Sequence, residues 1–270
     1  MKILFVGDIV GKPGRKALRD FLPGLVDRLG VDLVIGNVEN VAKGMGVSRE
    51  ALEEVKRAGV QIMTSGNHIW KKSGIEQLLE EERSLLRPAN YTDGVPGKGG
   101  MIWESNLGTK VGIVNLLGRV FLEAVECPFR VGARLAEELQ KKGARICIVD
   151  FHAEATSEKC ALGWFLDGKV SAVLGTHTHV QTADERVLPG GTGFITDVGM
   201  TGGLDSVIGV KVEASLKRFL TGVPQPFEPS GRNLGLQGVI LEVCEKTGRC
   251  LEIRRIRKSL DRGSGEVDNA

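Results

Sequence analysis

The sequence lacks the features that mark secreted, membrane-spanning and nucleic-acid-binding proteins. Its five cysteines are odd in number and include no Cys-x-x-Cys pair, which favours a reducing compartment over a disulfide framework. No apolar run approaches the length that crosses a membrane, and the apolar N-terminus is too short for a signal peptide because Asp8 interrupts it. The 36 basic and 34 acidic residues leave a net charge of +2, so no concentrated basic face for nucleic acid is evident. We therefore expect a cytoplasmic protein without a membrane or a dedicated nucleic-acid partner.

Aromatic residues make up only 5% of the chain, and histidine is scarcer still, with four in 270 residues. Each histidine lies in a short polar motif that follows an apolar run: His68, His152, His177 and His179. Imidazole is the commonest transition-metal ligand and the usual general acid near neutral pH. This placement predicts one metal-centred active site.

Short aliphatic and β-branched runs alternate with longer amphipathic stretches along the chain. The runs are apolar throughout and predict buried strands at residues 3–6, 33–35, 60–63, 146–149 and 170–174. The amphipathic stretches predict helices over residues 14–29, 48–58, 75–82 and 130–142, with Pro23 kinking or splitting the first. Two antiparallel hairpins are expected, at residues 99–117 and 238–256.

This alternation of strands and helices predicts an α/β fold in which two mixed β-sheets pack together and helices flank them. No repeat, linker or change of composition marks a second domain, so we expect one domain over residues 1–260. Residues 261–270 are polar and contain glycine, which predicts a frayed tail.

Polar residues of a restricted kind follow the predicted strands. Besides the histidines they are Asp8, Glu39, Asn40 and Asn67. Ligands of open α/β sheets bind outside the carboxyl ends of the strands, so these side chains and the histidines can meet in one crevice. His177 and His179 are alternate residues after a strand, so their two imidazoles can face one point. Oxygen and nitrogen donors without sulfur suit Mn, Fe, Zn or a pair of such ions.

Each motif taken alone has a simpler interpretation. Asp8 could cap the turn after the first strand, and residues 67–68 could form a turn with a helix cap. Residues 39–40 could belong to a solvated loop, and His152 could be a core histidine with its hydrogen bonds satisfied. The coincidence of all these motifs at successive strand ends favours the metal interpretation.

Other residues near these motifs keep two interpretations. Trp70 could stack on a substrate base or pack beneath a loop. Glu154, Thr156 and Lys159 could orient metal ligands or bind phosphate, and capping of a helix by Thr156 is the alternative. The glycine-rich segment 197–203 could face the substrate or form a turn.

Three blocks, Gly7-Asp8, Gly66-Asn67-His68 and Gly175-Thr176-His177-Thr178-His179, resemble the signature blocks of the calcineurin-like metallophosphoesterases. The stretches at residues 7–15, 37–40, 150–159 and 196–202 narrow the resemblance to the bacterial YmdB-like family, over residues 1–260. The resemblance implies a four-layer αββα metallophosphoesterase sandwich and two transition-metal ions per chain. Iron and manganese are the expected metals, with zinc or magnesium as alternatives.

Two blocks depart from the superfamily pattern. Val10 occupies the place of a histidine, and residues 37–40 stand where Gly-Asp-x-x-Asp is usual. The resemblance implies that Glu39 bridges the two ions and that Asn40 compensates for the missing histidine. The implied ligands are Asp8, Glu39, Asn40 and His179 for the first ion, and Glu39, Asn67, His152 and His177 for the second. His68 is then left off the metals as the catalytic proton donor.

A dinuclear site of this kind hydrolyses phosphodiesters by in-line attack of a metal-bridging hydroxide. The resemblance implies small cyclic nucleotides as substrates, the 2′,3′-cyclic and also the 3′,5′-cyclic forms. The alternatives are a metal-holding regulatory protein that affects RNA turnover through partner contacts, and a phosphomonoesterase or nucleotidase. Exposed sheet edges in a two-sheet fold are compatible with a homo-oligomer.

Overall fold

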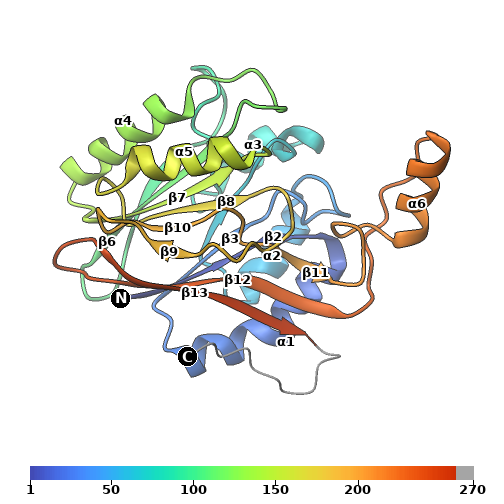
Figure 1. Ribbon diagram of the computed structural model, residues 1–270, viewed down its shortest axis with the longest axis horizontal. Coiled ribbons are helices and arrows are strands. Elements are labelled where there is room, and N and C mark those ends of the chain that lie inside the picture. The colour runs from blue at the N-terminus through green and yellow to red at the C-terminus, as the bar shows by residue number, and fades with distance from the viewer. Residues whose placement is uncertain (260–270) are drawn as a thin grey trace.

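Two β-sheets pack face to face in the computed structural model, which describes residues 1–259 (Figure 1). The first sheet has seven strands: β1 (Lys2–Val6), β2 (Asp8–Ile9), β3 (Leu33–Asn37), β4 (Ile62–Thr64), β11 (Met200–Gly203), β12 (Leu234–Val243) and β13 (Cys250–Ser259). Their order is β2-β11-β12-β1-β3-β4, with β13 paired to β12. The predicted tail at 261–270 lies outside the described residues.

The second sheet has six strands in the order β5-β6-β7-β8-β10-β9. They are β5 (Gly100–Glu104), β6 (Lys110–Leu117), β7 (Ile146–His152), β8 (Ala172–Thr176), β9 (Arg186–Val187) and β10 (Gly193–Ile195). Neighbours β6, β7 and β8 are parallel, as are β1, β3 and β4 in the first sheet. The predicted hairpins are confirmed as the antiparallel pairs β5–β6 and β12–β13.

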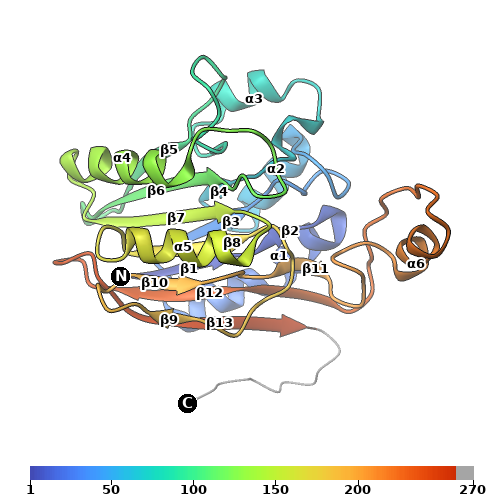
Figure 2. The ribbon, with the colours of Figure 1, turned by 45° about the horizontal axis from the view of Figure 1, so that its top comes forward.

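Helices cover the outer face of each sheet. Helices α1 (Gly11–Leu29) and α2 (Arg49–Arg57) pack on the first sheet, and α4 (Pro128–Lys141) and α5 (Thr156–Leu166) pack on the second (Figure 1). The short helices η1 (Ile69–Lys71) and α3 (Ile75–Glu81) share the core of α2, whereas α6 (Val212–Thr221) projects from the body (Figure 2). The predicted αββα sandwich of two mixed sheets is thereby confirmed. No helix within residues 1–259 is long and apolar enough to span a membrane.

Strand β1 shows why the central strands are apolar throughout. Its side chains alternate, so that Ile3 and Phe5 point between the sheets, where they join a core with residues of β7 and β8. Leu4 and Val6 point the other way and pack against α1. All four side chains are buried, because the sheet is covered on both faces.

The structure differs from the sequence prediction at several elements. Helix α1 continues through Pro23 without a break, because Leu22 and Leu25 are buried on either side and their packing offsets the hydrogen bond that proline removes. Helix α5 has no clear amphipathic pattern, since even Glu158 and Lys159 on it are buried, and it was therefore not among the predicted helices. Strands β10 and β11 and helix α6 were likewise not predicted.

Two glycines of α1 are expected to respond oppositely to alanine. Gly24→Ala should stabilise the protein by about 0.5–1 kcal/mol, because alanine favours the helix. A Cβ at Gly24 meets nothing within 4 Å, whereas a Cβ at Gly14 would lie 2.6 Å from the backbone oxygen of Thr201. Gly14→Ala should therefore destabilise the protein. Denaturant unfolding measures both changes, and a gain of stability in Gly14→Ala would contradict the close packing of α1 on β11.

Candidate metal centre

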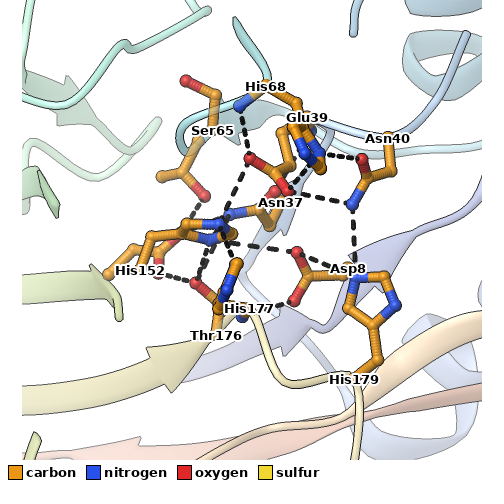
Figure 3. Close-up of polar contacts among 12 residues, drawn as sticks. Asp8, Asn37, Glu39, Asn40, Ser65, His68, His152, Thr176, His177 and His179 are labelled. Atoms are coloured by element: carbon orange, nitrogen blue, oxygen red, sulfur yellow. Dashed lines mark hydrogen bonds and ion pairs between the residues drawn. The ribbon is translucent and has the colours of Figure 1, made fainter. Parts of the chain in front are cut away.

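The structure brings all of the predicted site residues to the edge where the parallel strands end, and Figure 3 labels each of them except Asn67. Asp8 follows β1, residues 39–40 lie in the turn after β3, and residues 67–68 follow β4. His152 is the last residue of β7, so that strand extends beyond its predicted end at residue 149. Residues 177–179 form the turn after β8. Both sheets therefore contribute side chains to one site.

His152 lies at the centre of one half of the site. Its Nε2 atom is 3.2 Å from Glu39 Oε2, 3.2 Å from Asn67 Oδ1 and 3.0 Å from His177 Nδ1. Glu39, His152 and His177 each present a ligand atom within 4.8 Å of the other two, which makes them a candidate metal site. These are also the residues, with Asn67, that the family resemblance assigns to the second ion.

Asp8 lies at the centre of the other half. Its Oδ1 atom is 3.8 Å from His179 Nε2 and 3.9 Å from His152 Nδ1. Asn40 Nδ2 is 2.9 Å from Glu39 Oε1 and 3.2 Å from His179 Nε2. The four residues assigned to the first ion therefore face one another.

The buried Asp8 carboxylate carries the best local evidence that a cation belongs here. Asp8 is fully buried, and its Oδ1 atom has no hydrogen-bond partner among the described residues. A buried carboxylate oxygen without a partner is strongly destabilising, and a metal ion would satisfy it. Because Oδ1 faces two imidazoles, the donor set fits a transition metal.

Each predicted ligand histidine has one ring nitrogen against a hydrogen-bond acceptor. The pairs are His152 Nδ1 with Thr176 Oγ1 at 2.9 Å, His177 Nε2 with Glu154 Oε2 at 2.9 Å, and His179 Nδ1 with Ile208 O at 2.8 Å. A proton on that nitrogen leaves the other nitrogen, with its lone pair, free to bind a metal. The contacts of all three imidazoles thus favour the tautomer that a ligand needs.

A buried polar network lies behind His152. Thr176 Oγ1 accepts from His152 and donates to Asp150 Oδ1 at 2.7 Å, and Asp150 Oδ2 accepts from Thr64 and from Asn37 at 3.0 Å. Burial raises the pKa of Asp150 to about 6, against the opposing effect of nearby His152. Carboxylates placed behind a ligand in this way orient the imidazole. The sequence motif contained Asp150, but only the structure shows what it contacts.

The charges at the site are strongly coupled. Burial raises the pKa of Asp8. Burial also opposes ionisation of Glu39, but His152 and His68 outweigh it and hold the Glu39 pKa well below its usual range. Burial and the neighbouring His152 lower the pKa of His177 to about 3, so this imidazole is neutral and able to bind a cation. Despite its burial, His152 has a pKa raised to about 9 by Glu39.

His68 lies at the mouth of the site. Its Nδ1 atom is 2.8 Å from Asn40 Oδ1 and 3.2 Å from Glu39 Oε1, and its backbone N–H donates to Glu39 Oε2 at 3.1 Å. Its side chain is 24% exposed, whereas that of His152 is fully buried. These contacts hold the His68 ring beside Glu39 and Asn40.

The structure shows the contacts of four residues for which the sequence left two interpretations. Trp70 packs against the core of α1 and α2 and contacts Tyr91 edge-on at 5.5 Å, which favours the packing role. Glu154 Oε2 lies 2.9 Å from His177 Nε2, which favours the role of orienting that imidazole. Thr156 does not cap α5, because the N-cap position is Ala155. Lys159 is buried away from solvent.

Gly66 is required by the close packing of the site. A Cβ at this position would lie 2.1 Å from the His152 ring and 2.4 Å from Glu39 Oε2. Any larger residue would displace one of these side chains. The glycine of the Gly66-Asn67-His68 block is therefore explained by the approach of β4 to the site.

Comparisons with known proteins identify the family of the chain. Residues 4–256 match the family model described as YmdB-like protein. The chain is 43% identical over 256 residues to the Bacillus subtilis (strain 168) protein named 2′,3′-cyclic-nucleotide 2′-phosphodiesterase, covering 95% of this chain and 96% of that protein.

Solved structures show the same relationship. A hypothetical protein from Thermus thermophilus superposes with a TM-score of 0.89 at 43% identity, covering 96% of this chain and 99% of that chain. A structure described as a novel phosphatase from Mycoplasma pneumoniae gives 0.89 at 38% identity, covering 96% and 93%. A 5′-nucleotidase precursor from Thermus thermophilus shares the fold alone, with a TM-score of 0.59 at 15% identity over 96% of this chain and 54% of that chain. By sequence and by structure, the chain belongs to the YmdB-like protein family.

Proposed function

We propose that this chain is a metal-dependent phosphodiesterase that hydrolyses small cyclic nucleotides. The observation that carries the proposal is the unpartnered, buried Asp8 Oδ1 atom among imidazoles whose outer nitrogens are already engaged. A site built only for structure would satisfy that oxygen with a hydrogen bond from the protein. The name of the Bacillus subtilis relative supports the 2′,3′-cyclic substrate, and activity on 3′,5′-cyclic nucleotides is the broader form of the proposal.

Two ions, iron or manganese, would be held by the residues that converge at the strand ends. Asp8, Glu39, Asn40 and His179 would hold the first, and Glu39, Asn67, His152 and His177 the second. Such ions would lower the pKa of bound water and stabilise negative charge on the phosphoryl oxygens. Zinc and magnesium are the alternative metals.

His68 would donate the proton that the leaving oxygen needs. Hydrolysis of a cyclic phosphodiester breaks a P–O bond to a ribose oxygen, which departs as a poor leaving group unless it is protonated. His68 lies next to the predicted ligand Asn67 and contacts Glu39 and Asn40 through Nδ1, so Nε2 can face the substrate. A positioned acid of this kind accelerates a reaction by roughly 10²–10⁴-fold.

One assay separates this proposal from its alternatives. Purified protein loaded with Mn²⁺ or Fe²⁺ is tested on 2′,3′-cyclic AMP, 3′,5′-cyclic AMP, bis-p-nitrophenyl phosphate and 3′-AMP. We expect turnover of the diesters in preference to the monoester. Preference for 3′-AMP would indicate a phosphomonoesterase, and no turnover of any phosphoester would overturn the proposal in favour of a regulatory protein that acts through partner contacts. The cytoplasmic location and homo-oligomeric state stay predictions.

His177→Ala is expected to reduce the metal content of the protein. His177 presents Nδ1 to the centre of the site, and Glu154 holds its other nitrogen. Metal analysis should find two ions per chain in the wild type and fewer in the variant. Glu137→Ala, in an exposed ion pair on α4, serves as the control. Two ions per chain in His177→Ala would contradict its role as a ligand.

A further inference from the structure

Lys159 and Asp197 form a buried ion pair beneath the metal centre. Lys159 Nζ on α5 donates to Asp197 Oδ2 at 2.8 Å, and each side chain is only 1% exposed. Asp197 lies in the loop between β10 and β11. Lysine is almost never buried in this way unless its charge is paired, because moving an unpaired ammonium group out of water is strongly unfavourable. The catalytic proposal uses neither residue, so the pair needs another explanation.

Asp197 holds the turn that carries two predicted ligands. Its Oδ2 atom accepts from the backbone N–H of Thr178 at 3.0 Å and from Thr178 Oγ1 at 2.8 Å. Thr178 is the residue between His177 and His179. The carboxylate therefore fixes the middle of the turn whose two neighbouring side chains face the site.

The same carboxylate also fixes the segment that carries Asp8. Asp197 Oδ1 accepts from the backbone N–H of Gly199 at 2.9 Å, and the Gly199 carbonyl accepts from the backbone N–H of Asp8 at 3.0 Å. A Cβ on Gly7 would lie 2.1 Å from that carbonyl, so the two segments are in direct contact. One buried side chain thus links Asp8 to the histidine turn.

The histidine turn has a backbone conformation that needs such support. His177 has φ 100° and His179 has φ 64°, and residues other than glycine rarely adopt such positive φ angles. Such conformations persist only where the surroundings enforce them, and they concentrate at functional sites. Here His177 N–H donates to Asp8 Oδ2 at 3.1 Å, and Thr178 is held by Asp197.

Gly175 leaves room for the lysine. A Cβ at Gly175 would lie 1.7 Å from the Thr196 carbonyl oxygen and 3.2 Å from Cδ of Lys159. The stem of Lys159 therefore passes directly beneath the start of the turn. This packing explains the glycine that opens the Gly175–His179 block and places the ammonium group beside Asp197.

We propose that Lys159 and Asp197 are positioning residues that hold His177, His179 and Asp8 in metal-binding geometry. Lys159 Nζ holds the Asp197 carboxylate in place by donating to it, and Asp197 transmits that support to both ligand segments. This inference rests on the proposed metal centre. It predicts that loss of the pair weakens metal binding, in addition to any effect on folding.

The test measures Mn²⁺ binding to the purified protein by calorimetric titration and by metal analysis. Thermal unfolding of the metal-free protein is measured in parallel. Lys159→Met and Asp197→Asn should each weaken Mn²⁺ binding by roughly 10–100-fold, the usual effect of losing a group that orients a ligand. Thr178→Val removes only one hydroxyl donor and leaves the ion pair intact. It should fold normally and show a smaller loss, so it decides the question if Lys159→Met does not fold.

Lys56→Met is the control, because Lys56 on α2 forms an ion pair of 2.7 Å with Glu82 that is partly exposed and does not involve the site. It should bind Mn²⁺ as the wild type does. The inference would be overturned if Lys159→Met and Thr178→Val both bound Mn²⁺ with wild-type affinity and differed only in a lower unfolding temperature. That result would leave the proposed metal centre intact. A wild-type protein that binds no Mn²⁺ would overturn the metal centre and this inference with it.

Discussion

Replacing Glu39 with glutamine is expected to lower phosphodiesterase activity by roughly 10³-fold or more, because a bound metal supplies several kcal/mol of stabilisation to the transition state. Glu39 is 1% exposed and reaches both halves of the site, with Oε2 3.2 Å from His152 Nε2 and Oε1 2.9 Å from Asn40 Nδ2. The neighbouring histidines keep its pKa low, so the group is an anion that two cations can share. Glutamine keeps the shape but removes the charge.

Metal analysis of Glu39→Gln distinguishes loss of metals from a direct effect on the reaction. We expect fewer than two ions per chain and weaker binding of the remaining ion. Glu53→Gln on α2 is the matched control, since Glu53 lies in an exposed ion pair with Lys56. Two tightly bound ions in Glu39→Gln would show that Glu39 does not bridge them, and the dinuclear assignment would then have to be revised.

Replacing His68 with alanine is expected to slow different substrates by very different factors. With 2′,3′-cyclic AMP the leaving group is a ribose oxygen, and kcat should fall by roughly 10²–10⁴-fold once the acid is lost. With bis-p-nitrophenyl phosphate the leaving group is p-nitrophenolate, which departs without a proton, so kcat should change far less. Steady-state kinetics on both substrates, with metal content measured beside them, tests this directly.

His68→Asn provides the necessary control for His68→Ala. Nδ1 of His68 contacts Asn40 and Glu39, so removing the ring could also disturb two predicted ligands. Asparagine keeps a polar atom near the Nδ1 position but has no acidic proton to donate. It should reproduce the selective loss with the cyclic nucleotide. An equal loss with both substrates in both variants would assign His68 to the support of the metal ligands instead.

The arrangement of the site could be anticipated because it follows from a local rule. Each predicted ligand comes within a few residues of a strand end, and parallel strands end at the same edge of a sheet. The apolar character of β1 and β7 therefore indicated where Asp8 and His152 would lie. The chemical types of the side chains indicated a metal, and the resemblance to a known family divided them between two ions.

The supporting contacts could not be anticipated because they join distant segments. Asn37 and Asp150 are 113 residues apart, and Lys159 and Asp197 are 38 apart. Helix α5 has no one-sided apolar pattern, since its buried face includes Lys159. Hydrophobic periodicity detects a helix with one apolar, buried face and one polar, exposed face. It does not detect a helix whose charged residues are also buried.

The sequence by itself determined the α/β character, the strand ends and the residue types that meet there. These depend on the alternation of side chains along each strand and on the chemistry of single residues. Only the tertiary structure decided which nitrogen of each histidine faces the site, which carboxylate oxygen is left without a partner, and that Asp197 links Asp8 to the histidine turn. The reason is physical: such contacts exist only once the two sheets have packed and brought the ends of β1 and β8 together.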